Sequence, residues 1–159
     1  MNTVRPVFLL LALISLIVTG CSHGGRPGGV SVSIVDFRPT DASLLESRGI
    51  LTLRFTNENI APLGFSGSRH KLYLNGSYVG TAVNSKPFGV PPLDSVTQEV
   101  PIQFENMALI RQLIAMRDSQ TAAYRLESVL FQTIYEEKFE IKSHSEGSLD
   151  LRKLAGTAK

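Results

Sequence analysis

The chain has 159 residues, the size of one domain behind a short leader, with 16 Lys and Arg against 14 Asp and Glu. A formal net charge of +2 and the lack of a basic block exclude the electrostatic footprint of a nucleic-acid-binding protein, so we expect no nucleic-acid partner. The single cysteine excludes an internal disulfide framework.

The first 21 residues have the pattern of an export signal. Arg5 is the only charge before Cys21, and Val7 to Val18 forms an almost wholly apolar run. At 1.5 Å per residue this run reaches about 18 Å, short of the roughly 30 Å of a bilayer core, which is typical of a signal peptide. Segment 18–21 (VTGC) then resembles the bacterial lipobox. This resemblance implies cleavage between Gly20 and Cys21 and acylation of the Cys21 thiol, as in a bacterial lipoprotein.

The lipobox divides the chain and sets its expected location. We expect four parts: a signal peptide (1–20), an acylated Cys with a Gly-rich flexible tether (21–29), a folded domain (30–152) and a frayed C-terminus (153–159). The lipid bilayer is then a partner through Cys21. In such lipoproteins an Asp after the Cys holds the protein at the inner membrane. Ser22 stands there, which implies the outer membrane, facing the periplasm, in a host with two membranes.

From Val30 onward, apolar and polar residues alternate in short runs, which indicates antiparallel strands. The first run changes phase near Ile34, where we expect a bulge. Residues 41–49 are predicted to be a connection, and the next strand covers 51–56. Asn-Gly at 75–76, between two alternating runs, predicts a tight hairpin because both central residues of a type I′ turn need positive φ.

A proline-rich segment, a strand and a helix are predicted next. We expect 87–92 (PFGVPP) to be a rigid loop. The strand over 96–104 contains Pro101, which cannot donate to a ladder, so we expect an edge strand or a bulge there. Apolar residues at helical spacing predict a helix over 107–117, with Asn106 as its N-cap. Its apolar face favours a plug at the end of a sandwich over membrane contact, because its polar face has few Lys and Arg.

The C-terminal part is predicted to form more strands. Segments 124–132 and 135–142 read as a hairpin with Phe139 and Ile141 pointing inward, and 148–152 as a last short strand. The prediction is an all-β fold: an antiparallel Ig- or fibronectin-III-like β-sandwich of about seven or eight strands with one short helix. An antibody-type Cys–Trp–Cys core is excluded, because the chain has one Cys and no Trp.

Four stretches together resemble the group 2 late-embryogenesis-abundant proteins (LEA type 2), whose domain is also called the water-stress and hypersensitive-response (WHy) domain. They are 53–59 (LRFTNEN), 71–80 (KLYLNGSYVG), 90–104 with the following helix, and 147–151 (GSLDL). The family's usual turn is Asn-Pro-Asn, and here Glu58 replaces the proline between Asn57 and Asn59.

The resemblance covers 30–152 and carries expectations of fold and function. It implies a fibronectin- or Ig-like sandwich with a short helix, a link to desiccation and other stress responses, and no family-wide catalytic residues. Asn57 and Asn59 are the site residues that it points to within the domain.

Residue chemistry adds no active site to this picture. His23, His70 and His144 are far apart in sequence and lack metal-ligand spacing, so we expect no metal, no cofactor and no enzyme activity. A lone His such as His70 is expected to be structural or on the surface. A hydrolase would need a deep pocket with convergent titratable groups.

Two functions remain in competition at this stage. The first is a membrane-anchored lipoprotein whose non-catalytic WHy-like domain protects or binds envelope components under water stress. The second is a structural or assembly lipoprotein that docks an envelope protein partner. Its docking surface would be a sandwich edge, such as the strand with Pro101, or the loops over 57–68 and 84–95.

Overall fold

The computed structural model describes residues 29–42, 47–115 and 121–150. The predicted signal peptide, Gly20, Cys21, Ser22, the predicted tether up to residue 28 and the C-terminal residues from 151 lie outside the described residues. Within the described ranges the chain forms nine strands and one helix: β1 (Val30–Ala42), β2 (Ser47–Asn57), β3 (Leu63–Phe65), β4 (Gly67–Leu74), β5 (Ser77–Asn84), β6 (Phe88–Val90), β7 (Ser95–Phe104), α2 (Asn106–Ala115), β8 (Thr121–Ile134) and β9 (Glu137–Asp150). The all-β prediction with a single short helix is confirmed.

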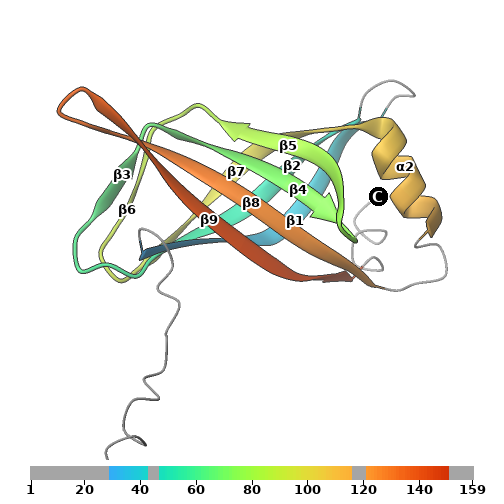
Figure 1. The fold of residues 1–159 in the computed structure, drawn as a ribbon, viewed down its shortest axis with the longest axis horizontal. Coiled ribbons are helices and arrows are strands. Elements are labelled where there is room, and N and C mark those ends of the chain that lie inside the picture. The colour runs from blue at the N-terminus through green and yellow to red at the C-terminus, as the bar shows by residue number, and fades with distance from the viewer. Residues whose placement is uncertain (1–28, 43–46, 116–120, 151–159) are drawn as a thin grey trace, which may run out of the picture.

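Seven strands form one curled antiparallel sheet, in the order β1-β2-β7-β5-β4-β8-β9, and β3 pairs with β6 in a small second sheet. Only three residue pairs join β5 to β7, from Gly80–Phe104 to Ala82–Ile102. Figure 1 shows β1, β2 and β7 lying behind β4, β8 and β9, so the curled sheet encloses a core between two layers.

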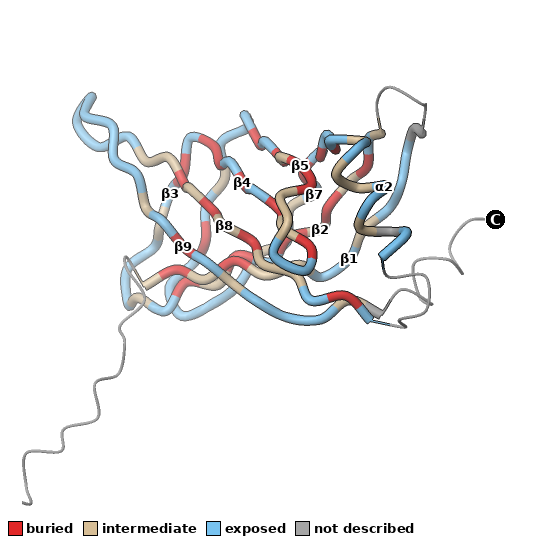
Figure 2. Tube along the Cα trace, turned by 45° about the vertical axis from the view of Figure 1, so that its right-hand side comes forward, coloured by how far each residue is buried: buried red, intermediate tan, exposed pale blue. Residues whose placement is uncertain are grey.

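The core consists of the inward-facing residues of this sheet. Along β2, β7 and β8 buried positions alternate with more exposed ones, as Figure 2 shows. The largest buried apolar side chains come from both layers: Leu51, Leu53, Phe55, Ile102, Leu126 and Leu130. Because burial of each such side chain stabilises the fold by about 1.5–3 kcal/mol, this layer is the main source of stability.

The N-terminal strands confirm the predicted bulge and correct the predicted connection. The β1–β2 register shifts between Ile34 and Asp36, as the change of phase near Ile34 indicates. However, β1 runs to Ala42 and β2 begins at Ser47, so most of 41–49 is strand. A second register shift, between Pro39 and Asp41, lets the pairing continue past the proline.

The Asn75-Gly76 hairpin between β4 and β5 is confirmed. Both residues have positive φ, +46° for Asn75 and +81° for Gly76, as the type I′ turn requires. The Asn75 side chain also accepts a hydrogen bond from the N–H of Ala123, at 3.1 Å. The turn is thereby linked to the start of β8.

The prediction that 87–92 is only a rigid loop was wrong, because it contains β6. This strand pairs with β3, and Phe88 contacts Phe65 and Phe55, with ring centroids 5.3 and 4.7 Å apart. The small β3–β6 sheet therefore packs its aromatic residues against the core. Strands of three residues are too short to show a period in the sequence.

The strand with Pro101 is not an edge strand and has no bulge at Pro101, contrary to prediction. Strand β7 lies between β2 and β5, and its register with β2 is continuous through Pro101. Pro101 lies directly before Ile102, the first β7 residue to pair with β5, so its missing N–H removes no ladder hydrogen bond to β5.

Helix α2 begins one residue earlier than predicted. The N–H of Leu109 donates to the carbonyl of Glu105 at 2.9 Å, so Glu105 and not Asn106 occupies the cap position. The predicted end at 116–117 lies outside the described residues. Leu109 packs against the core, and Gln112 Nε2 donates to Ser77 Oγ at 2.8 Å. The helix covers one end of the sandwich in Figure 1.

The last hairpin is longer than predicted. Strands β8 and β9 form one continuous ladder, so 148–150 is the end of β9 and not a separate strand. The turn is at Tyr135 and Glu136, both with positive φ. Ile141 packs against the core as expected. Phe139 is 44% exposed and does not point inward, because the hairpin extends beyond the core.

Candidate functional site

A buried asparagine organises one end of the sandwich. Asn57, the last residue of β2, is fully buried. Its Nδ2 donates to the carbonyls of Ala61, Pro91 and Val90, at 2.8, 3.0 and 3.3 Å. Its Oδ1 accepts from the backbone N–H and the side-chain Nδ2 of Asn59, both at 2.9 Å. One amide therefore joins the two loops 58–62 and 91–94, which we call the loop end.

The first described residue enters the fold at this loop end. The Gly29 carbonyl accepts hydrogen bonds from the N–H of Glu58 at 2.8 Å and from Asn59 Nδ2 at 3.2 Å. Gly29 has φ +60°, and a Cβ on it would lie 2.5 Å from the Asn59 amide oxygen. Only glycine fits this position without strain.

Glu58, which replaces the proline of the family's usual turn, forms a hydrogen bond that a proline cannot form. Its backbone N–H donates to Gly29. A proline has no N–H to donate. The replacement therefore adds a hydrogen bond between the turn and the start of the domain. Asn57 and Asn59, to which the family resemblance pointed, lie at the centre of this arrangement.

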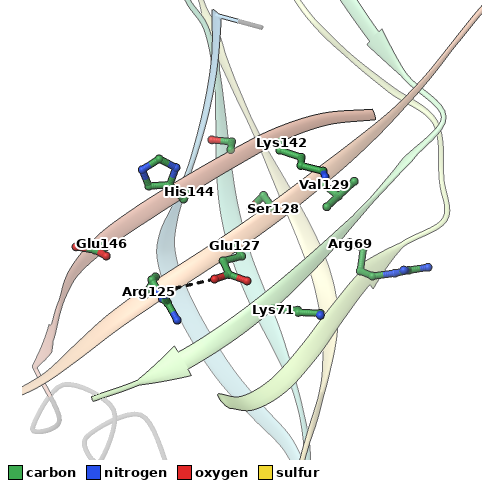
Figure 3. Close-up of a pocket in the computed structure, with 10 residues that line it drawn as sticks. Arg69, Lys71, Arg125, Glu127, Ser128, Val129, Lys142, His144 and Glu146 are labelled. Atoms are coloured by element: carbon green, nitrogen blue, oxygen red, sulfur yellow. Dashed lines mark ion pairs between the residues drawn. The ribbon is translucent and has the colours of Figure 1, made fainter. Parts of the chain in front are cut away.

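The outer face of β4, β8 and β9 carries a shallow groove of about 580 Å³, which we call the outer groove. Figure 3 shows its side chains coming from these three strands. The charged side chains that line it are four cations, Arg69, Lys71, Arg125 and Lys142, and two carboxylates, Glu127 and Glu146. The groove thus offers charged hydrogen-bonding groups to a ligand, with cations in excess.

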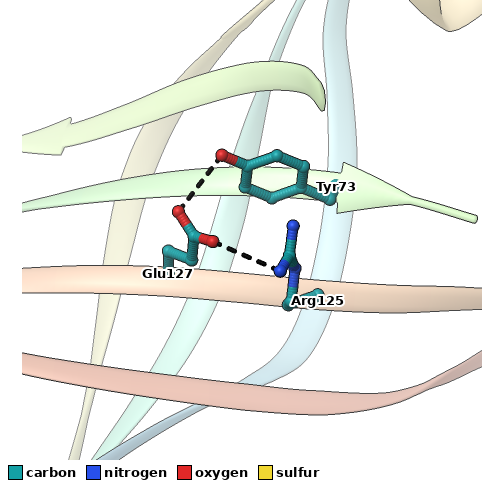
Figure 4. A network of polar contacts seen from close by, with 3 residues as sticks. All are labelled: Tyr73, Arg125 and Glu127. Atoms are coloured by element: carbon teal, nitrogen blue, oxygen red, sulfur yellow. Dashed lines mark hydrogen bonds and ion pairs between the residues drawn. The ribbon is translucent and has the colours of Figure 1, made fainter. Parts of the chain in front are cut away.

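Three side chains of this face form a fixed polar cluster (Figure 4). The hydroxyl of Tyr73 donates to Glu127 Oε2 at 3.1 Å, and Arg125 lies 3.5 Å from Glu127 Oε1. The Arg125 guanidinium also stacks over the Tyr73 ring, 4.3 Å from its centroid. Desolvation, followed by the hydrogen bond to Glu127, raises the pKa of the Tyr73 phenol.

His70 is a structural residue. It is fully buried, with Nδ1 2.8 Å from Ser128 Oγ and Nε2 2.8 Å from Ser68 Oγ. Desolvation by burial lowers its pKa from 6.5 to about 4, so the ring is neutral at pH 7. Ser68 and Ser128 are buried as well. Because Ser68, His70 and Ser128 are all buried and hydrogen-bonded to one another, the Ser-His-Ser cluster supports the fold.

The two histidines that the structure describes lie in different surroundings. His144 lines the outer groove, His70 is in the core, and His23 lies outside the described residues. Among the described residues, no three His, Cys, Asp or Glu side chains are grouped so that they could hold a metal ion. In the same part of the chain, no helix has the length and hydropathy needed to cross a membrane.

The outer groove was missed by the sequence interpretation. The residues of the groove alternate with core residues on β4 and β8, as Arg69 and Lys71 do on either side of the buried His70. This alternation predicts that they face outward, but not that they form one groove. They become one surface because β4 pairs with β8, with Lys71 opposite Glu127. The spacing of charges within one strand does not reveal this pairing.

Residues 52–147 match the LEA_2 family model, described as "Late embryogenesis abundant protein". The match includes more than half of the chain, which therefore belongs to this family, as the resemblance implied. The family supports a non-catalytic domain of the LEA type. A comparison with curated protein sequences gave no match.

One solved structure supports the same fold, and two others are also similar to this chain. The solution structure of AT1g01470 from Arabidopsis thaliana is 14% identical with a TM-score of 0.61, over 84% of this chain and 88% of that one. A protein from Archaeoglobus fulgidus is 16% identical with a TM-score of 0.49, over 76% and 97%. A putative LEA protein, At2g46140.1, is 12% identical with a TM-score of 0.46, over 94% and 91%. At 14% identity, the likeness to AT1g01470 concerns the fold alone.

Proposed function

We propose that this protein is a lipoprotein whose non-catalytic LEA type 2 domain, held at the cell envelope by acylated Cys21, protects or binds envelope components during water stress. The family match over 52–147 is the observation that carries the domain's part in this proposal. The VTGC segment behind an apolar run supports the anchor. Ser22 supports placement in the outer membrane.

The outer groove supports a binding role for the domain. Arg and Lys side chains bind phosphate and carboxylate groups through charge-assisted hydrogen bonds. The Tyr73–Glu127–Arg125 cluster holds one cation in place, with Arg125 restrained by both partners. When water is withdrawn, such a surface can replace part of the hydration of an anionic envelope component.

Survival of drying tests the stress role. A strain that lacks the gene is expected to lose viability on drying and osmotic shock, with recovery when the wild-type gene is restored. The Cys21→Ala form, which cannot be acylated, should not restore survival, although its domain is unchanged. Equal survival of the deletion strain and the wild type would remove the stress role.

Membrane fractionation tests the location separately. The wild-type protein should sediment with outer membranes, Ser22→Asp with inner membranes, and Cys21→Ala should be released from both. If Cys21→Ala stays as tightly membrane-bound as the wild type, the proposed anchor is wrong.

A second candidate function, docking of an envelope protein partner, is favoured by one surface. Met107, Ile110 and Ile114 are exposed on one side of α2, at helical spacing. The strand with Pro101 is not an edge strand, because β7 lies between β2 and β5 and the edge strands of the sheet are β1 and β9. A photo-crosslinker at Ile110 in intact cells should capture one reproducible partner, and Met107→Ser with Ile114→Ser should abolish the capture. Without such a partner, this second function fails.

A further inference from the structure

The loop end carries an exposed apolar surface directly beside the start of the described chain. Six apolar residues of the two loops are exposed, at positions 60–62 (IAP) and 91–93 (PPL). Ile60 is 87% exposed and Leu93 is 69% exposed. We propose that this surface is a second membrane contact, which dips into the lipid interface to which Cys21 is anchored. The inference rests on the proposed lipid anchor and adds an orientation to it.

The apolar side chains of the loop end are held in place. Asn57 fixes both loops through the carbonyls of Ala61 and Pro91. The N–H of Leu93 donates to the Asn59 carbonyl at 3.0 Å, across the two loops. Leu93 has φ +52°, a conformation that is unusual for a bulky residue. The exposed side chains of Ile60 and Leu93 are thus held by a rigid backbone, which reduces the entropy lost when they insert into lipid.

The length of the tether keeps this surface near the bilayer. From Cys21 to Gly29 the chain advances eight residues, which is about 29 Å even when fully extended. The Gly29 carbonyl is bound to Glu58 and Asn59, so the tether joins the fold at the loop end itself. Strand β8 has 14 residues, which span about 46 Å at 3.3 Å per residue. In Figure 1 α2 lies at the opposite end of the sandwich from the start of β1. The tether therefore holds the loop end, and not α2, close to the bilayer.

The charges of the loop end favour an apolar contact over an electrostatic one. Glu58 and Asp94 lie in these two loops and are exposed, and both are acidic. They would be repelled by anionic headgroups, so the fitting occupant is an uncharged or zwitterionic lipid surface. Insertion of apolar side chains into such an interface does not depend on salt, in contrast to binding through the cationic outer groove.

Depth-dependent quenching in vesicles tests this inference on the acylated full-length protein. Acylation occupies the Cys21 thiol, so a single introduced cysteine takes an environment-sensitive fluorophore. Leu93→Cys and Pro92→Cys report the loop end, and Met107→Cys, at a residue that is 65% exposed on α2, is the matched control. The vesicles contain phosphatidylcholine and phosphatidylethanolamine with brominated acyl chains. We expect several-fold stronger quenching at positions 92 and 93 than at 107.

A second pair of variants separates insertion from mere proximity. Ile60→Ser with Leu93→Ser should reduce quenching of the Pro92→Cys label several-fold, while flotation with vesicles stays unchanged. Met107→Ser with Ile114→Ser removes two apolar side chains of similar exposure at the other end and should leave that quenching unchanged. Since all four side chains are exposed, neither pair should lower the unfolding temperature.

Four outcomes would overturn the inference. Equal quenching at positions 93 and 107 would show no preferred orientation. No quenching at either position, in protein that still floats with vesicles, would overturn the contact and leave the lipid anchor intact. Protein that no longer floats would overturn the anchor and the contact together. Loss of quenching in about 0.5 M NaCl, where exposed charges are screened, would assign the contact to charged groups instead.

Discussion

The loop end and the helix end of the sandwich both expose large apolar side chains, but they hold them differently. At the loop end, five hydrogen bonds of the buried Asn57 side chain hold two irregular loops. At the helix end, the backbone groups of α2 form hydrogen bonds within the helix. The helix packs on the sheet through Leu109 and the Gln112–Ser77 contact. The backbone groups of irregular loops need side-chain partners for their hydrogen bonds, whereas the backbone groups inside a helix bond to one another.

Removal of the Asn57 amide should give the largest effect. Asn57→Ala leaves the carbonyls of Ala61 and Pro91 and the N–H of Asn59 without this partner. Because hydrogen bonds contribute about 1 kcal/mol each and unpaired buried groups cost more, we expect a loss of about 3 kcal/mol. Urea unfolding measures it. Gln112→Ala, which removes an amide contact at the helix end, should cost below about 1 kcal/mol. Equal costs at both ends would contradict the comparison.

Acidification should weaken the core that joins the two ends. The folded-state pKa of His70 is lowered by burial from 6.5 to about 4. The stability gained from keeping the ring neutral is therefore complete above pH 6.5 and is lost as the pH falls through about 4. At about 1.4 kcal/mol per pKa unit, the loss amounts to about 3 kcal/mol.

The pH dependence is measured by urea unfolding at several pH values between 7.5 and 4, with two histidine variants. His70→Gln should flatten this part of the stability profile, whereas His144→Gln, at an exposed residue of the outer groove, should leave it unchanged. A profile that is equally steep in His70→Gln would assign the loss to other groups.

The entry of the chain at the loop end should be moderately sensitive. Gly29→Ala forces a positive φ on alanine and pushes its Cβ against Asn59, so we expect a loss of about 1–2 kcal/mol in thermal unfolding. Gly76→Ala also requires positive φ but meets open space. It should cost less than Gly29→Ala, and the reverse order would argue against close packing between Gly29 and Asn59.

The outer groove should contribute least to stability. Glu127→Gln weakens the charge contact with Arg125 but keeps an acceptor for Tyr73, and both side chains of the ion pair are about 40% exposed. Because exposed ion pairs contribute roughly 0–1 kcal/mol, the unfolding free energy should change by less than about 1 kcal/mol. A larger loss would show that this cluster supports the fold.

Features with a local signal were predictable from the sequence. Alternation of apolar and polar residues identified the main strands, Asn75-Gly76 identified its hairpin, and the change of phase near Ile34 identified the bulge. The family resemblance singled out Asn57 and Asn59 before their contacts were visible. Each of these features is determined within a few neighbouring residues.

Features that depend on distant pairing were not predictable. The three-residue strands β3 and β6 are too short to show a period. The inner strand β7 tolerates Pro101 because β5 pairs with β7 only from Ile102 to Phe104. The outer groove exists only because β4, β8 and β9 lie side by side, so that Lys71, Glu127 and His144 become neighbours across the ladders.

The most direct test of the lipid-anchored account is the intact mass of the protein purified from membranes of its host. The account predicts a chain that begins at Cys21, lacks residues 1–20 and carries a diacylglyceryl group on the thiol. A protein that retains residues 1–20 and has a free Cys21 thiol would contradict the anchor, and with it the proposed orientation of the loop end toward lipid.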